Sequence, residues 1–211
     1  MAKKDIDVVE IIIDSFKFLF DNPGIIVYYL LPILTLILAT LMFGFSFFFG
    51  AGLNIKFTVA LIGQILTIGI IAFLLNALAT ASAIIKTNQP KKSYTYCLRK
   101  GLNKTPKLFV ATILSGLAVF AGMVAFIIPG IYIMVRLAVV APACVLEKEL
   151  GLKKSWNYTQ KKVWDVFALI LLLFIVNIVA AMIPLIGMFL SILIIGPVTV
   201  IAYTKLYKEI K

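Results

Sequence analysis

Six blocks of mainly apolar residues limit how this chain can fold more than any other feature. They cover residues 25–48, 58–85, 108–128, 131–146, 164–183 and 186–204. About twenty residues of α-helix, at about 1.5 Å per residue, cross a hydrocarbon core roughly 30 Å thick. Because 63% of the 211 residues are hydrophobic, too little polar sequence remains to cover six such blocks in water. The sequence therefore predicts an all-α integral membrane protein with six transmembrane helices, forming a single membrane domain over residues 1–211.

The segment 5–21, which precedes the first block, has the pattern of an amphipathic helix. Its polar residues recur three or four positions apart and so share one face of a helix; they are Asp7, Glu10, Asp14, Lys17 and Asp21. Apolar residues cover the other side, and Asn22-Pro23-Gly24 ends the pattern, since proline disfavours helix at the residue before it. A helix of this kind is predicted to lie along the membrane surface.

The basic residues indicate which side of the membrane each loop faces. Lys and Arg total 20 against 9 Asp and Glu, and they gather in the segments 86–107 and 147–163 and at the C-terminus. Short loops rich in Lys and Arg stay in the cytoplasm. Both termini and both basic loops are therefore predicted to be cytoplasmic, in a multi-pass protein of the cell membrane. A net charge of +11 spread in this way indicates anionic lipid headgroups as partners and argues against nucleic acid.

Part of the sequence repeats at a constant offset of 54 residues. The segment 98–107 matches 152–161 at Leu, Lys, Asn, Thr and Lys, and each copy leads into a pair of apolar blocks. Ser15-Phe16-Lys17-Phe18, before the first pair, resembles a degenerate third copy. The predicted unit is an amphipathic interfacial helix followed by a hairpin of two spans, used three times. Chance similarity between lysine-rich loops is the alternative explanation.

Four polar residues inside the apolar blocks are candidates for ligand contact. Arg136 lies roughly 8 Å along the helix from Pro129-Gly130, which places it toward the outer side as a candidate anion site. Its alternative role is to extend toward the membrane surface or to donate to backbone carbonyls freed by a bend at Pro142. Gln64, Asn76 and Asn177 complete the set, with interhelical hydrogen bonds as their alternative role.

The second basic loop combines lysines with tryptophans, which is typical of contact with lipid headgroups. The candidate residues are Lys153, Lys154, Trp156, Lys161, Lys162 and Trp164. No Asp or Glu lies in the interior of an apolar block, since Asp165 sits at the cytoplasmic end of the block 164–183, and the chain contains no histidine. The common proton relays, nucleophile pairs and metal ligands are therefore missing, so we expect no catalytic residues, no metal site and no cofactor.

The stretch from Ile128 to about Leu172 resembles a known membrane domain. The matching residues are Ile128-Pro129-Gly130-Ile131-Tyr132, Val135-Arg136-Leu137, Ala141-Pro142, Val145-Leu146-Glu147, Leu152 to Trp156 and Lys161 to Val166. The pattern is similar to the multi-pass domain fused to some prokaryotic glycerophosphodiester phosphodiesterases, and to its stand-alone relatives of undefined function. The resemblance implies a prokaryotic inner-membrane helical bundle. Hydrolysis does not carry over, because the catalytic barrel of the fused enzymes is not among these 211 residues.

Two functions fit these observations. The first is a non-catalytic membrane protein that interacts with lipid, organises the membrane or assists a partner, which would be another membrane protein or a second copy of the chain. The alternative is a transporter or channel with a polar path near Arg136, Gln64, Asn76 and Asn177. These side chains would then have to share one polar cavity, whereas the first function lets them lie apart.

Overall fold

A computed structural model describes residues 6–49, 55–147, 149–183 and 186–211. The described residues form helices only, with no strand among them. The elements are α1 (Val8–Asp21), α2 (Gly24–Phe49), α3 (Ile55–Asn88), α4 (Tyr94–Ala125), α5 (Ile127–Leu137), α6 (Val140–Leu146), α7 (Leu152–Thr159), α8 (Val163–Ala181), α9 (Ile186–Leu190), the π-helical turn η1 (Ser191–Ile195) and α10 (Gly196–Ile210).

Five helical stretches within the described ranges are long and apolar enough to cross a membrane. They are Gly24–Met42, Leu61–Asn88, Tyr94–Ala125, Ile127–Leu146 and Val163–Ala181. The predicted span 186–204 falls on α9, η1 and α10, where a π-helical turn interrupts the α-helix. The fold is thus all-helical with several candidate membrane spans, as the apolar blocks predict.

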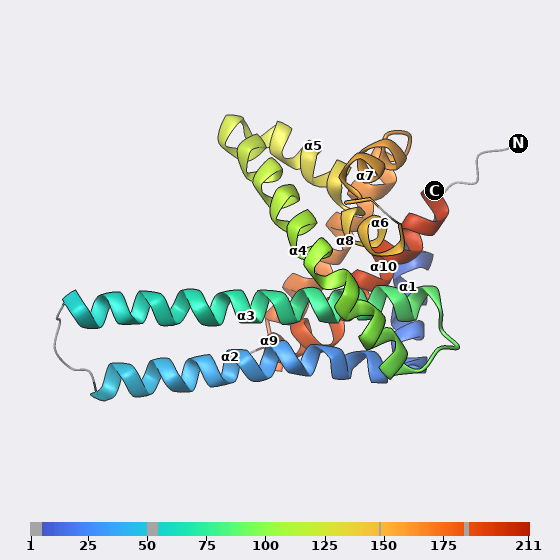
Figure 1. The fold of residues 1–211 in the computed structure, drawn as a ribbon. Coiled ribbons are helices and arrows are strands. Elements are labelled where there is room, and N and C mark those ends of the chain that lie inside the picture. Colours follow the sequence, from blue (N-terminus) through green and yellow to red (C-terminus); the bar gives the residue numbers. More distant parts are fainter. Residues whose placement is uncertain (1–5, 50–54, 148, 184–185) are drawn as a thin grey trace, which may run out of the picture.

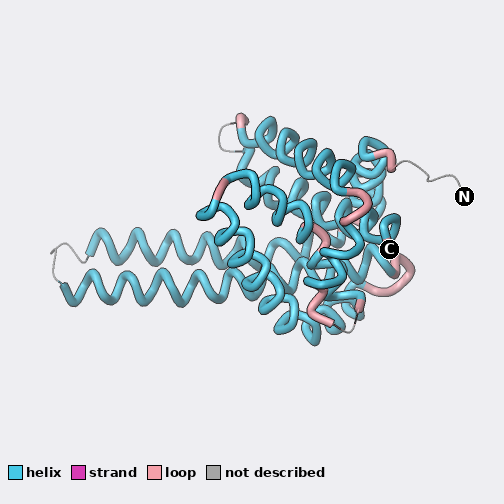
Figure 2. Tube along the Cα trace, turned by 90° about the horizontal axis from the view of Figure 1, so that it is seen from above, coloured by secondary structure: helices cyan, strands magenta, loops and turns pink. Residues whose placement is uncertain are grey.

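Two pairs of helices, α2 with α3 and α4 with α5, extend in different directions from a packed region of the protein, which we call the base. Figure 1 shows α2 and α3 side by side as one arm, with α4 and α5 leaving the base in another direction. From above, the first arm again projects away from the remaining helices (Figure 2). The C-terminus and α1 lie at the base, far from the tip of the first arm. Most of the fully buried side chains lie in this base.

The core of the base forms where the ends of three helices meet. Buried side chains of α3, such as Ala83 and Ile84, pack with Val140 and Cys144 of α6 and with Ile201 of α10. The alanines of α3 allow this close approach, because small side chains bring helix backbones together. The same core includes Leu19 and Ile25, so the base joins residues from all three thirds of the chain.

Three short amphipathic segments pack around this core in the same way. The start of α4 contacts α3, α7 contacts α5 and α6, and α1 contacts α10, which joins the two ends of the chain. Each segment buries positions four residues apart, with a small residue in the middle: Ile11, Ser15 and Leu19; Cys97, Gly101 and Thr105; and Gly151, Ser155 and Thr159. The last two triplets are related by the offset of 54 residues seen in the sequence.

The first amphipathic helix is shorter than the predicted segment 5–21 and buries a different face. Asp7 caps α1, because its carboxylate accepts hydrogen bonds from the backbone N–H groups of Val9 and Glu10 at 3.0 Å. The buried residues are those of the triplet described above, while Val9, Ile13 and Phe20 form an exposed apolar stripe. This stripe suits contact with the membrane interface.

Two helix boundaries differ from the predicted ones because of proline. The predicted bend at Pro142 lies one turn earlier, at Ala138 and Val139, between α5 and α6. Proline has no N–H to donate to the carbonyl four residues before it, and its ring clashes with that carbonyl, which here belongs to Ala138. The predicted break at Ile128-Pro129-Gly130 lies at extended Phe126 instead, because the first turn of α5 tolerates Pro129. A further boundary also differs: α4 begins at Tyr94, within the predicted loop 86–107, and continues through Pro106.

Candidate anion-binding site

Arg136 lies near the end of α5 and is one of the largest fully buried side chains of the described residues. Only 2% of its surface is exposed. Its guanidinium carbon lies 4.6 Å from the centre of the Trp156 ring and 5.7 Å from that of Tyr132. These two rings pack edge to face, with centres 6.0 Å apart. A buried cation is thus held between two aromatic rings from different helices.

The guanidinium has unused hydrogen-bonding capacity. Its Nε and Nη1 atoms are buried and have no hydrogen-bond partner. Burying polar groups without partners is costly, more so when they carry charge. The aromatic faces offset part of this cost through cation–π attraction. Trp156 and Tyr132 are themselves 38% and 46% exposed, so the rings that contact the buried guanidinium reach the surface of the protein.

The backbone of Arg136 fixes the site to the second basic loop. Because α5 ends at Leu137, the last carbonyls of the helix lack the usual donor four residues on. Ser155 Oγ and Thr159 Oγ1 of α7 donate to the Arg136 carbonyl at 2.8 and 3.2 Å. These bonds also place Trp156, which lies between the two donors in sequence, over the guanidinium.

The repeat contains a second copy of the helix contact between Arg136 and Ser155, namely the contact between Ser82 and Gly101. We call each of these two contacts a junction. Ser82 precedes Arg136 by 54 residues, and Gly101 precedes Ser155 by the same number. Gly101 packs so closely on Ser82 that an added Cβ would lie 2.4 Å from the serine Oγ. Ser155 contacts Arg136 at the corresponding place. One copy of the junction thus forms with a serine, so packing alone does not require a guanidinium in the other.

The contacts with α7 show which segment lies beside Arg136. The outer side was expected from its distance to Pro129-Gly130, along a span 131–146 with a bend at Pro142. The helix instead stops at Leu137, and α7, from the basic segment 147–163, packs against its end. Arg136 therefore contacts residues of the segment 147–163, and its side of the membrane stays a prediction.

The other three polar candidates lie in different surroundings. Gln64 borders a largely apolar pocket of about 340 Å³ between α2 and α3, together with Thr40 and Gly69. Asn76 on α3 and Asn177 on α8 are exposed. The transport hypothesis needs these side chains in one polar cavity with Arg136, and this arrangement does not favour it.

The predicted headgroup residues divide into three groups. Lys154 and Lys162 form ion pairs, with Glu147 and with Asp165 (3.2 Å) respectively. Lys153, Lys161 and Trp164 are exposed, Trp164 to 81%. Trp156 belongs to the site of Arg136. The exposed members remain open to headgroups, whereas the two paired lysines have protein partners.

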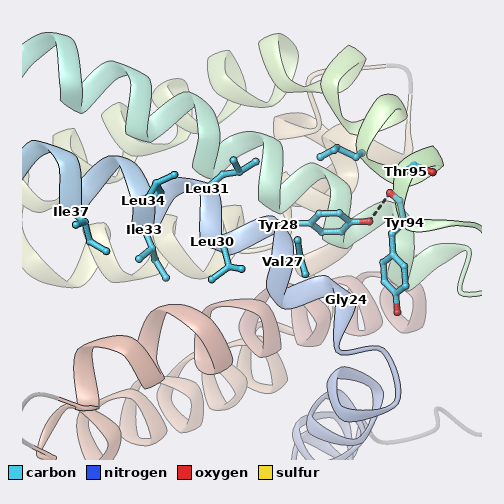
Figure 3. Close-up of a pocket in the computed structure, with 11 residues that line it drawn as sticks. Gly24, Val27, Tyr28, Leu30, Leu31, Ile33, Leu34, Ile37, Tyr94 and Thr95 are labelled. Carbon is cyan, nitrogen blue, oxygen red and sulfur yellow. Dashed lines mark hydrogen bonds between the residues drawn. The ribbon is translucent and has the colours of Figure 1, made fainter.

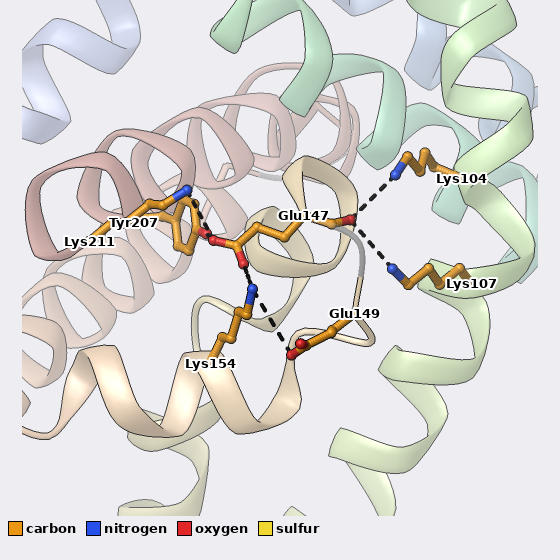
Figure 4. Close-up of polar contacts among 7 residues, drawn as sticks. All are labelled: Lys104, Lys107, Glu147, Glu149, Lys154, Tyr207 and Lys211. Atoms are coloured by element: carbon orange, nitrogen blue, oxygen red, sulfur yellow. Dashed lines mark hydrogen bonds and ion pairs between the residues drawn. The ribbon is translucent and has the colours of Figure 1, made fainter.

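Glu147, which was not predicted as a site residue, is the centre of a buried polar cluster (Figure 4). Its carboxylate accepts hydrogen bonds from Lys154 and Tyr207 and pairs with Lys211 at 3.1 Å. Its carbonyl accepts from Lys104 and Lys107, both at 3.4 Å. The cluster ties α4, α7 and α10 to the end of α6. An acid directly after an apolar block, surrounded by lysines, was the sequence signal for it.

The electrostatics of this cluster keep Glu147 ionised. Burial alone raises the pKa of a carboxyl group, but the hydrogen bonds from Lys154, Tyr207 and Lys211 outweigh it and hold the pKa of Glu147 at about 2. Burial and the bond to Glu147 raise the pKa of Tyr207. At neutral pH the Glu147 carboxylate is therefore ionised and pairs with Lys154 and Lys211.

Neither metal-binding groups nor comparisons with known proteins give further evidence about the Arg136 site. Within the described ranges, no three His, Cys, Asp or Glu side chains are grouped to hold a metal ion. The buried thiols Cys97 and Cys144 are not joined in a disulfide. Comparison with known protein families, curated proteins and solved structures found no match to this chain.

Proposed function

We propose that this protein is a non-catalytic, multi-pass membrane protein that binds anionic phospholipid through Arg136. The observation that carries the proposal is the buried guanidinium with two unpaired nitrogens beneath the partly exposed rings of Trp156 and Tyr132. A phosphodiester oxygen pair matches the planar, two-pronged donor geometry of arginine. Lys153 and Lys161, exposed on and after α7, add positive charge nearby.

The proposed topology has six spans in three hairpins, each preceded by an interfacial helix. The run α9, η1 and α10 supplies the sixth span, so that both termini and both basic loops face the cytoplasm. The placement of α1, the start of α4 and α7 around one base supports this arrangement. The resemblance of residues 128–172 to a prokaryotic membrane domain favours the prokaryotic cell membrane as its location.

The state of Glu147 supports a binding role rather than a catalytic one. Glu147 directly follows α6, the helix after the one that carries Arg136. Its carboxylate already accepts hydrogen bonds from Lys154 and Tyr207 and pairs with Lys211. A general base for neutral pH needs a pKa near 7, whereas the pKa of Glu147 is about 2. A fixed carboxylate of this kind stabilises structure and leaves the nearby cations oriented.

The test compares lipid stabilisation of purified protein with Arg136→Leu and Arg136→Lys. Adding phosphatidylglycerol should raise the Tm of the wild type more than phosphatidylcholine does, because ligands that bind the folded state stabilise it. Both variants should lose at least half of this difference, since an ammonium does not reproduce the bidentate contact. Without added lipid, Arg136→Leu should be as stable as wild type, because it removes an unpaired buried charge.

Lys17→Leu is the matched control, since it also removes one positive charge but from an exposed site on α1. It should keep the full difference between the two lipids. An equal phosphatidylglycerol effect in the wild type and in both Arg136 variants would refute the site.

A further inference from the structure

An apolar groove runs along the first half of α2 and ends at the start of α4 (Figure 3). Its volume is about 610 Å³, which is within the usual range for ligand sites. The residues along it, among them Leu30, Leu34 and Ile37, are apolar. From Gly24 to Ile37 the groove extends roughly 20 Å at the rise of an α-helix. This length exceeds half of a roughly 30 Å hydrocarbon core, so the groove is long enough to cross one leaflet.

The end of the groove at α4 is held in place by tyrosines. Tyr28 donates a hydrogen bond to the Tyr94 carbonyl at 2.8 Å. The Tyr94 ring lies directly on Gly24, where an added Cβ would come within 2.6 Å of a ring carbon. Lys86 lies over the same ring, 4.2 Å from its centre, and donates to the carbonyls of Pro90 and Lys92. The groove therefore has a built polar end at the predicted cytoplasmic interface.

The segment of α4 and the loop before it that border this end carry positive charge only, while Asp21 precedes Gly24 on the side of α1. The segment 86–107 contains seven Lys and Arg residues and no acid. Thr95, whose side chain borders the groove, is exposed, as are Arg99 and Lys100 on the following turn of α4. An apolar channel that is long enough to cross one leaflet and ends in a hydroxyl among cations complements an acyl chain joined to an anionic headgroup.

We propose that this groove binds one acyl chain of an anionic glycerophospholipid from the cytoplasmic leaflet, with the headgroup beside Thr95. The proposal rests on the proposed function only in placing the protein in a membrane that contains such lipids. The site is separate from Arg136, because α2 and the start of α4 line it, whereas α5 and α7 form the guanidinium site. A lipid seated here would contact two helices at once and fix their mutual position.

The experiment uses phosphatidylglycerol carrying a diazirine on one acyl chain, incorporated with the full-length protein into nanodiscs. After irradiation, labelled peptides should map to residues 24–37 and 94–98. Leu34→Trp should fill the groove, and Thr95→Glu should repel the headgroup, each lowering the yield at these peptides by about tenfold. The matched controls are Ile175→Trp, on an exposed face of α8, and Asn103→Glu, exposed on α4 away from the groove. Both should label as the wild type does.

Competition identifies what the groove recognises. Unlabelled phosphatidylglycerol should displace the probe several-fold better than phosphatidylcholine does. Equal competition by the two lipids, or unchanged labelling in Leu34→Trp, would overturn the proposal and leave ordinary surrounding lipid as the explanation. Arg136→Leu should label this groove as the wild type does, so failure of the Arg136 site and failure of the groove give different results.

Discussion

Replacing Glu147 by glutamine tests whether the polar cluster holds the base of the protein together. The substitution keeps the shape of the side chain and removes its charge. Lys211 would then lose its ionic partner and Lys154 would keep only the 4.0 Å pair with Glu149, while Tyr207 could still donate to the amide oxygen. We expect the Glu147→Gln protein to fold and to unfold at a lower temperature.

The magnitude follows from burial and solvent screening. Breaking a fully buried ion pair costs about 3 to 5 kcal/mol. Here the carboxylate side chain is 7% exposed, but those of Lys154 and Lys211 are 31% and 52% exposed and remain hydrated after the loss. Screening therefore reduces the expected loss at Glu147 to about 1 to 2 kcal/mol.

The lowered pKa of Glu147 determines how its contribution to stability changes with pH. The pKa of Glu147 is about 2 in the folded protein and has an ordinary value of 4.5. A carboxyl with a lowered pKa stabilises the fold above its unfolded pKa and loses this effect as the pH falls toward the folded value. The stability difference between wild type and Glu147→Gln should be full at pH 7 and less than half as large at pH 3.

Thermal unfolding in detergent, followed by tryptophan fluorescence at both pH values, measures this difference. Glu149→Gln is the control, since Glu149 is exposed and lies 4.0 Å from Lys154. It should change stability little at either pH. A Glu147→Gln loss that is the same at pH 3 as at pH 7, or no larger than that of Glu149→Gln, would refute the reasoning.

Two further predictions concern packing and topology. Gly101→Ala should destabilise the protein by about 1 to 3 kcal/mol, because its methyl group would meet Ser82. Gly116→Ala, with nothing within 4 Å of the added carbon, should be neutral or slightly stabilising in the same unfolding assay. Equal losses of stability in Gly101→Ala and Gly116→Ala would contradict the close contact between Gly101 and Ser82. Reporter domains fused at Lys91 and Lys211 should both report the cytoplasm; opposite sides for the two reporters would show an odd number of spans between Lys91 and Lys211.

Continuous apolar sequence was sufficient to predict several helices closely. The predicted spans 25–48 and 164–183 correspond to α2 (Gly24–Phe49) and α8 (Val163–Ala181). In these segments the apolar run is long enough to cross a membrane as a helix, and α2 continues through Pro32. The offset of 54 residues also anticipated related packing, since Gly101 and Ser155 occupy equivalent buried positions.

The surroundings of the polar residues were less predictable, because they depend on how helices meet. Arg136 was expected near the outer side, and only the end of α5 at Leu137 and the hydroxyl groups of α7 reveal its true neighbours. Trp156 was predicted as an interfacial residue, but its stacking on Arg136 requires α7 to fold back against α5. The contacts of Glu147 with Tyr207 and Lys211 could not be predicted either, since these residues lie 60 or more positions away in sequence.

The most direct test of the central claim is the distance between the guanidinium of Arg136 and lipid phosphate. The chain has two arginines, Arg99 and Arg136, so the Arg99→Lys protein labelled with ¹⁵N-arginine carries a single reporter. In phosphatidylglycerol bilayers, solid-state NMR recoupling of ¹⁵N to ³¹P should show a separation of roughly 4 Å, as expected for a charge-assisted hydrogen bond to phosphate. A guanidinium signal with no dephasing by ³¹P would contradict the proposed function.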